Sequence, residues 1–153
     1  MKKRRLTIDK VWNKFAPLVK DILMDVYGNK CVTCSKEELT GRDKQLGHFF
    51  PKGAYSSVRW WILNLGIQCS YCNGAKQGAT LMFSEWFRKT HGQQALDDIT
   101  VLAHKSHSTS QYEYELIIEK VKEYEKMIKS KEITYKQLYK KIIDDKFGLF
   151  ISS

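Results

Sequence analysis

Four cysteines in two identical pairs constrain the fold of this 153-residue chain more than any other feature. The two Cys-x-x-Cys pairs are Cys31/Cys34 and Cys69/Cys72. Each pair makes a tight turn whose two thiolates can bind one ion, and two such turns complete a tetrahedral four-cysteine zinc site. A site of this kind is closed, so the zinc would be structural, and its binding should be coupled to folding.

The redox compartment decides between zinc and disulfides. The chain begins Met1-Lys-Lys-Arg-Arg5, but no apolar run follows, so the pattern is not that of a secretory signal peptide. No stretch approaches the length of a membrane span, so we expect no membrane partner. We therefore expect a cytoplasmic protein with reduced thiols, in which paired cysteines favour zinc. Four unrelated buried thiols are the alternative.

The charge of the chain indicates a polyanionic partner. Lys plus Arg number 26 and Asp plus Glu 17, which gives a net charge of +9. Such an excess favours nucleic acid, and the alternative is that it only aids solubility. Three basic residues of the cysteine-rich segment are the candidate phosphate-binding groups: Lys52, Arg59 and Lys76. Because nothing resembles a base-reading helix, we expect recognition of DNA shape over sequence.

Hydrophobic periodicity predicts a single α+β domain in three parts. Residues 1–28 form a helical segment, 29–92 an irregular cysteine-rich core, and 93–153 a helical region. The predicted architecture is therefore a small zinc-stapled core flanked by N- and C-terminal helices.

Local signals place individual elements. A helix is predicted from about Thr7 to Tyr27, split into two pieces at Pro17 because proline suits a first turn and not an interior. Residues 58–62 are the best strand candidate. Thr134 is the predicted N-cap of the last helix. Other helices are predicted over 81–91, 93–103 and around 117–128.

Three polar residues beside the cysteine pairs are candidates for catalysis. His48 lies between the pairs, Asn64 precedes the second pair, and Asn73 directly follows the last cysteine. A neutral imidazole suits removal of a proton from water near neutral pH, and an amide oxygen suits Mg²⁺. The alternatives are that His48 packs against Phe49 and Phe50, that Asn64 ends a strand, and that Asn73 caps a helix.

The order of these motifs resembles that of the HNH, or ββα-metal, nucleases that carry four-cysteine zinc, including phage junction-resolving enzymes of the endonuclease VII kind. It is most similar to the phage NinG (Rap) recombination protein family. The resemblance covers most of the chain and is carried by Gly28-Asn-Lys-Cys-Val-Thr-Cys34, Gly47-His48-Phe49, Val58-Arg59-Trp60 and Asn64 with Gln68-Cys-Ser-Tyr-Cys-Asn73.

This resemblance implies a phage- or prophage-encoded endonuclease that acts in the host cytoplasm on branched or recombining DNA, such as a Holliday junction. It assigns the general base to His48 and the orientation of the imidazole to a carbonyl of Asn64. It assigns the binding of a catalytic Mg²⁺ or Mn²⁺ to Asn73, which the neighbouring Cys72–zinc bond would hold in position.

Gly47 departs from the pattern of many such nucleases, which carry an aspartate metal ligand directly before the histidine. NinG-like proteins also have Gly-His at this point. Asn73 is thereby left without an obvious carboxylate co-ligand, and the candidate second ligands are Asp43, Gln45 and His48 itself.

Other functions stay open at this point. One is an HNH restriction or homing nuclease that cuts linear duplex DNA, and another is a non-catalytic zinc module that binds DNA or a recombination protein. RNA-directed activity is a third. A resolvase that cuts two strands needs two active sites, which makes a homodimer an open alternative.

The remaining aromatic and histidine residues are assigned to packing and to the surface. We expect at least one of Trp60 and Trp61 in the core, with stacking on unpaired bases as the alternative role for both and for Tyr55. Three histidines outside the pattern are expected at the surface: His91, His104 and His107.

Overall fold

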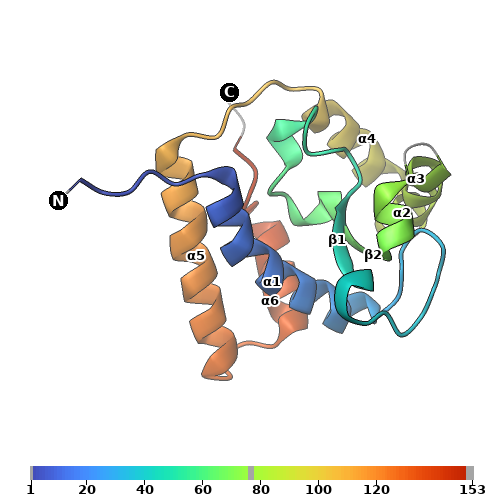
Figure 1. The fold of residues 1–153 in the computed structure, drawn as a ribbon, viewed down its shortest axis with the longest axis horizontal. Helices are drawn as coiled ribbons and strands as arrows, with labels where there is room; N and C mark the ends of the chain where they lie inside the picture. Colours follow the sequence, from blue (N-terminus) through green and yellow to red (C-terminus); the bar gives the residue numbers. More distant parts are fainter. Residues whose placement is uncertain (1, 76–77, 151–153) are drawn as a thin grey trace.

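A small two-stranded sheet lies among helices in the computed structural model, which describes residues 2–75 and 78–150 (Figure 1). The helices are α1 (Ile8–Tyr27), α2 (Ser70–Gly74), α3 (Gly78–His91), α4 (Gln93–Ala103), α5 (Gln111–Lys129) and α6 (Tyr135–Asp144). The strands are β1 (Gln45–His48) and β2 (Leu65–Gln68), and short 3₁₀ turns span Gly41–Asp43, Ser56–Val58 and Ile62–Asn64. The predicted α+β class is confirmed. None of the helices in the described ranges has the length and hydrophobicity needed to cross a bilayer.

The helix α1 is continuous, so the predicted break at Pro17 is wrong. Proline at this position removes the hydrogen bond to the Asn13 carbonyl. Pro17 is exposed, and both residues line a solvent-filled groove, so water can reach that carbonyl. The opposite face of α1 is apolar and buried, and its burial outweighs the free-energy cost of Pro17 that remains. The buried residues of this face are Val11, Phe15, Leu18, Val19, Ile22 and Leu23.

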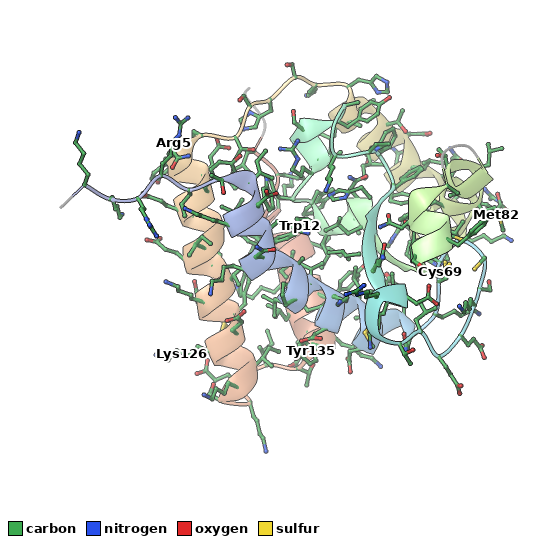
Figure 2. All side chains as sticks on the ribbon, viewed as in Figure 1. Arg5, Trp12, Cys69, Met82, Lys126 and Tyr135 are labelled. Atoms are coloured by element: carbon green, nitrogen blue, oxygen red, sulfur yellow. The ribbon has the colours of Figure 1, made fainter. Side chains whose placement is uncertain are left out.

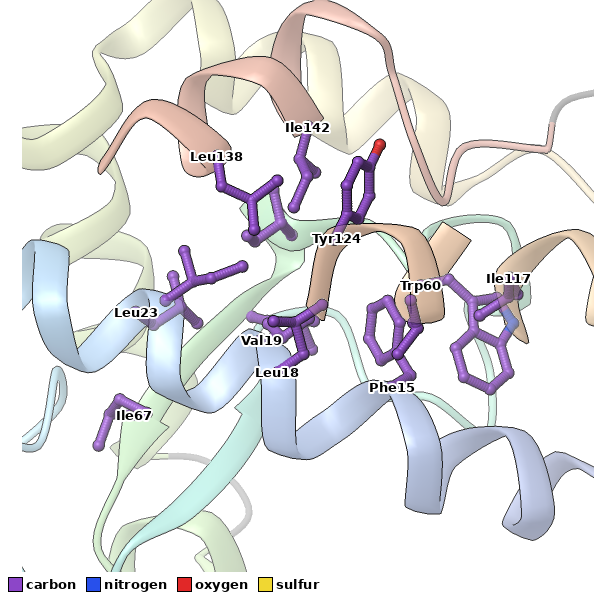
Figure 3. Packing of buried hydrophobic residues seen from close by; sticks show 14 of the residues in the cluster. Phe15, Leu18, Val19, Leu23, Trp60, Ile67, Ile117, Tyr124, Leu138 and Ile142 are labelled. Carbon is purple, nitrogen blue, oxygen red and sulfur yellow. The ribbon is translucent and has the colours of Figure 1, made fainter. Parts of the chain in front are cut away.

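That buried face packs against α5 and α6 to form a helical layer (Figure 3). Figure 3 labels side chains of this cluster from all three helices: Phe15, Leu18, Val19 and Leu23 with Ile117, Tyr124, Leu138 and Ile142. Capping boxes fix where α5 and α6 begin, through Ser110 with Glu113 and Thr134 with Gln137. The predicted N-cap at Thr134 is confirmed.

The strand predicted over residues 58–62 is wrong. This segment lies in the loop between β1 and β2, and 3₁₀ turns occupy its ends. Trp60 packs into the helical layer, whereas Val58 and Trp61 pack with α3 and α4. The apolar residues of the segment are thus buried between two cores without the ladder of a strand. The expectation that at least one tryptophan is in the core is confirmed, because both are buried.

The sheet is antiparallel and is covered on both faces. Its register pairs Gln45 with Gln68 and Gly47 with Gly66 on one face, and alternation places Leu46, His48, Leu65 and Ile67 on the other. Leu65 and Ile67 pack with α1. The Gly66 face instead lies against Phe83 of α3 and Val32 of the first cysteine pair. Strand β1 therefore stands between the helical layer and the cysteine-rich side.

Two of the three histidines expected at the surface are packed. His91 is in edge contact with Tyr27, Trp86 and Phe87, and His107 Nε2 lies 2.8 Å from Glu113 Oε2. His104 is exposed as predicted.

Candidate functional site

The four cysteines form one compact cluster whose geometry fits zinc. Their sulfur atoms all lie within 4.8 Å of one another, and Cys34 Sγ and Cys69 Sγ are 3.8 Å apart. Tetrahedral zinc with Zn–S bonds of about 2.3 Å places its sulfur ligands about 3.8 Å apart. Three of the four thiols are buried and Cys34 is exposed. The predicted four-cysteine cluster is therefore confirmed, and it could hold a zinc ion.

Backbone geometry shapes both cysteine turns. Ser35 N donates to Cys31 O, and Val32 N donates to Ile67 O at 2.8 Å, which ties the first turn to β2. In the second turn Cys69 is the N-cap of α2, and its sulfur accepts a hydrogen bond from Cys72 N. Each pair is thus held for binding a single ion.

Asp43 connects the two turns. Its Oδ1 accepts hydrogen bonds from the Ser70 amide and hydroxyl, and its Oδ2 lies 2.6 Å from Lys36 Nζ. Lys36 first, and then Ser70, lower the pKa of this carboxyl to about 2. Asp43 does not line the groove described next, so we remove it from the candidates for a second ligand of the catalytic metal.

A groove of about 800 Å³ runs past β1. One wall is α1, and the other is made by α2 and the start of α3 (Figure 2, where Trp12 marks the first wall and Cys69 the zinc side). Three lysines lie in its lining: Lys20, Lys44 and Lys52. No Asp or Glu of residues 2–75 and 78–150 lines it, so the groove is basic and suited to an anion.

His48 lies in this groove at the end of β1, stacked on Trp12 with ring centroids 5.1 Å apart. Its Nε2 is 3.1 Å from the Arg59 carbonyl. Since a carbonyl can only accept, Nε2 carries the proton and the lone pair is on Nδ1. Burial lowers the pKa of His48 to about 4, to which the charges of Lys52 and Arg59 add. The imidazole is therefore neutral at pH 7.

Asn64 is fully buried and does not contact His48 through the bond that was expected. Its side chain pairs with the Phe50 backbone, accepting from N at 2.8 Å and donating to O at 3.1 Å. Its own carbonyl accepts from Phe49 N. The imidazole Nε2 is instead held by Arg59, inside the loop that Asn64 closes. The expected hydrogen bond from His48 to an Asn64 carbonyl is therefore wrong. Asn64 affects the position of the imidazole through the loop that carries Arg59.

Asn73 lies on the other side of β1, among amide groups. Its Nδ2 donates to Gln45 Oε1 at 2.8 Å, and its Oδ1 lies near Gly47. Gln68 also lines the groove here, and its Nε2 donates to Thr33 Oγ1. The structure thus brings the predicted Asn73 and Gln45 together. Carboxamide oxygens are ligands that Mg²⁺ and Mn²⁺ accept, so this donor set fits such a cation.

The predicted DNA contacts divide into three cases. Lys52 lines the groove. Arg59 does not; its guanidinium donates to the Lys52 carbonyl at 2.7 Å and braces the loop. Lys76 lies outside the described residues.

Sequence reasoning missed the α1 wall. Its groove-facing residues follow helical spacing: Asn13, Ala16, Pro17 and Lys20. This stripe of small and polar residues, opposite the apolar face, is the signal that could have identified it.

Comparison with known protein families finds a match over most of the chain. The family described as "Bacteriophage Lambda NinG protein" matches residues 1–133. No curated protein and no solved structure matches the chain.

Proposed function

The chain belongs to the bacteriophage lambda NinG family, which is related to phage recombination, and from this premise and the groove we propose a metal-dependent endodeoxyribonuclease. Its substrate would be branched or recombination-intermediate DNA in the phage-infected host cell, and its reaction the hydrolysis of a phosphodiester bond. The observation that carries the proposal is the placement of His48, a half-buried imidazole in the basic groove whose Nε2 donates to the Arg59 carbonyl and leaves Nδ1 unprotonated.

His48 is suited to act as the general base. With Nε2 donating to Arg59 O, the unprotonated Nδ1 can take a proton from water. The stacked Trp12 ring and the carbonyl together fix the plane of the imidazole. Asn64 is a positioning residue in this scheme, because it closes the loop that carries Arg59.

The two sides of β1 divide the chemistry. His48 lies on the α1 face of the sheet, whereas Gly47 and Gln68 lie on the other face, beside Asn73 of α2. Hydrolysis by in-line attack needs the attacking water and the leaving oxygen on opposite sides of phosphorus. A phosphate placed over β1 would have the imidazole on one side and the amide oxygens on the other. A Mg²⁺ or Mn²⁺ held by Asn73 would supply positive charge to that phosphate.

The lysines of the groove would hold the flanking DNA backbone. Lys20 and Lys44 come from the α1 side and the turn before β1, and Lys52 from the loop after it. Contacts of this kind depend on salt and not on sequence. They fit a substrate recognised by its shape.

The test is cleavage of a labelled four-way junction and of its linear duplex with Mg²⁺, Mn²⁺ or no added divalent ion. We expect metal-dependent cutting of the junction. His48→Ala should lower the rate by roughly 10²- to 10⁴-fold, the usual range for loss of a general base. His104→Ala, at an exposed histidine, is the matched control, and zinc content should stay the same in all three proteins.

Three outcomes would contradict parts of the proposal. Tight junction binding without cutting would identify a non-catalytic DNA-binding module, the second candidate, which the lack of a described groove carboxylate favours. Equal cutting of junction and duplex would identify a linear-DNA nuclease. An equal loss of fold in His48→Ala and in a zinc-ligand variant would overturn the assignment of His48.

A further inference from the structure

We infer that Gln68 is a ligand of the catalytic cation, so that two neutral amide oxygens, from Gln68 and Asn73, hold it beside Gly47. This inference rests on the proposed function and deepens it. Gln68 would be the second ligand that the sequence pattern left open. It lies on β2, the strand paired with β1, where Gly47 stands in place of the usual aspartate.

The first observation is the space beside Gly47. A Cβ added at this residue would overlap Gln68 Oε1 and lie 3.0 Å from Asn73 Oδ1. Both oxygens therefore converge on the place that a side chain at position 47 would fill. The register explains the approach of Gln68, because it lies on the same face of the sheet as Gly47, two pairs along the ladder.

The second observation is how Gln68 is held. Its side chain is only 3% exposed, yet it lines the groove. Its Nε2 donates to Thr33 Oγ1 at 2.7 Å, which leaves Oε1 as the atom facing Gly47. Within the described part of the chain, no donor is hydrogen-bonded to this oxygen. This oxygen therefore has its lone pairs free for a ligand from the groove, which can be water or a cation.

The third observation is that both oxygens are fixed to the zinc cluster. Gln68 directly precedes Cys69, and Asn73 directly follows Cys72. The partner of Gln68, Thr33, lies inside the first cysteine pair. Binding of zinc therefore sets the separation of the two oxygens, which connects the structural metal to the catalytic one.

A donor set without charge has a measurable consequence. Affinity for a hard cation increases with the number of charged ligands, so two amides should bind it weakly until a phosphate adds negative charge. Converting Gln68 to a carboxylate should therefore tighten cation binding in the absence of DNA.

The test measures free Mn²⁺ by electron paramagnetic resonance in titrations of the zinc-loaded full chain without DNA. We expect Gln68→Glu to bind Mn²⁺ roughly tenfold more tightly than the wild type, because it adds one charged ligand. The Thr33 hydroxyl can donate to the new carboxylate, so the fold should persist, and zinc content and melting temperature would verify this. Gln137→Glu makes the same change at the N-cap box of α6, outside the groove, and should leave Mn²⁺ binding unchanged.

Gly47→Ala provides an independent variant. Its methyl group would displace the Gln68 carboxamide without removing a polar group, and we expect weaker Mn²⁺ binding than in the wild type. The inference would be overturned if the Gln68→Glu variant bound Mn²⁺ no better than the Gln137→Glu variant. It would also be overturned if Gln68→Glu showed no binding at millimolar Mn²⁺.

The two proposals fail separately. Loss of cleavage in His48→Ala together with unchanged Mn²⁺ binding in Gln68→Glu would leave the nuclease standing without the Gln68 ligand. A shift in Mn²⁺ binding in a protein that cuts no DNA would leave a cation site without the nuclease.

Discussion

The helical layer and the cysteine-rich side of this molecule are held together by different means. The layer of α1, α5 and α6 buries a continuous apolar cluster (Figure 3). The segment from Asn29 to Gln45 has little regular structure, and it is held by thiols clustered for one ion and by hydrogen bonds such as those of Asp43. The comparison teaches that one side is stabilised by area removed from water, whereas the other depends on a cysteine cluster that could hold a zinc ion.

The candidate site lies where these two regions meet. His48 is stacked on Trp12 of the helical layer, and the amide group of Asn73 follows directly on the last cysteine. Each region therefore supplies one part of the proposed chemistry. Perturbing one region at a time should separate the two contributions.

The largest effect should come from removing a zinc ligand. We expect Cys69→Ser to lose zinc and with it most of the stability of the cysteine-rich side, because binding of structural zinc contributes on the order of 10 kcal/mol in small zinc domains. Zinc content by metal analysis and circular dichroism during melting would measure both losses.

A cavity in the helical layer is the matched comparison. Ile117→Ala at a fully buried site of α5 should cost about 2–5 kcal/mol while the protein keeps its zinc. If Cys69→Ser kept both its zinc and its melting temperature, the metal would not be what holds this side. If Ile117→Ala also released zinc, the two regions would unfold as one unit.

An intermediate effect should appear as pH dependence at the seam between α1 and α3. Burial lowers the pKa of His91 to about 4. Because this lies below the unfolded value of about 6.5, the unfolded chain binds more protons between these values, and stability falls as pH falls from 6.5 towards 4. Between pH 7 and pH 5 the loss should be about 2 kcal/mol.

His91→Phe should remove this part of the pH dependence while leaving the cysteines unchanged. Denaturant unfolding of the wild type and the variant at pH 7 and pH 5 would measure the difference, with His104→Phe, at an exposed position, as control. An equal fall in stability in wild type and His91→Phe would place the acid sensitivity elsewhere, with His48, whose pKa is lowered in the same way, and the cysteine thiolates as the candidates.

The smallest effect should distinguish the walls of the groove. Lys20 comes from the helical layer and Lys52 from the loop after β1. Each replacement by Ala should weaken junction binding modestly and reduce the slope of log affinity against log salt by about one, if the lysine contacts a phosphate. Lys126→Ala on α5 is the control, and a slope change confined to Lys52 would exclude α1 from the DNA surface.

Much of the fold was predictable from local sequence patterns. The two wrong predictions, the strand over residues 58–62 and the helix break at Pro17, share a cause. The boundary between α3 and α4 at Gly92 and the N-cap of α6 at Thr134 both depend on neighbouring residues, so they were predictable. Residues 58–62 have the composition of a strand, but their burial comes from two cores that meet only in three dimensions. Pro17 would break an isolated helix, and it is tolerated here because its face is open to water.

The sequence by itself determined the four-cysteine cluster, the basic charge and the candidacy of His48, Asn64 and Asn73, because residue type and spacing suffice for these. Only the tertiary structure decided which carbonyl holds His48, that Asp43 serves the cysteine turns, and that Gln68 reaches the space beside Gly47. The physical reason is that such contacts join residues distant in sequence. They depend on strand register and loop path, which no local pattern encodes.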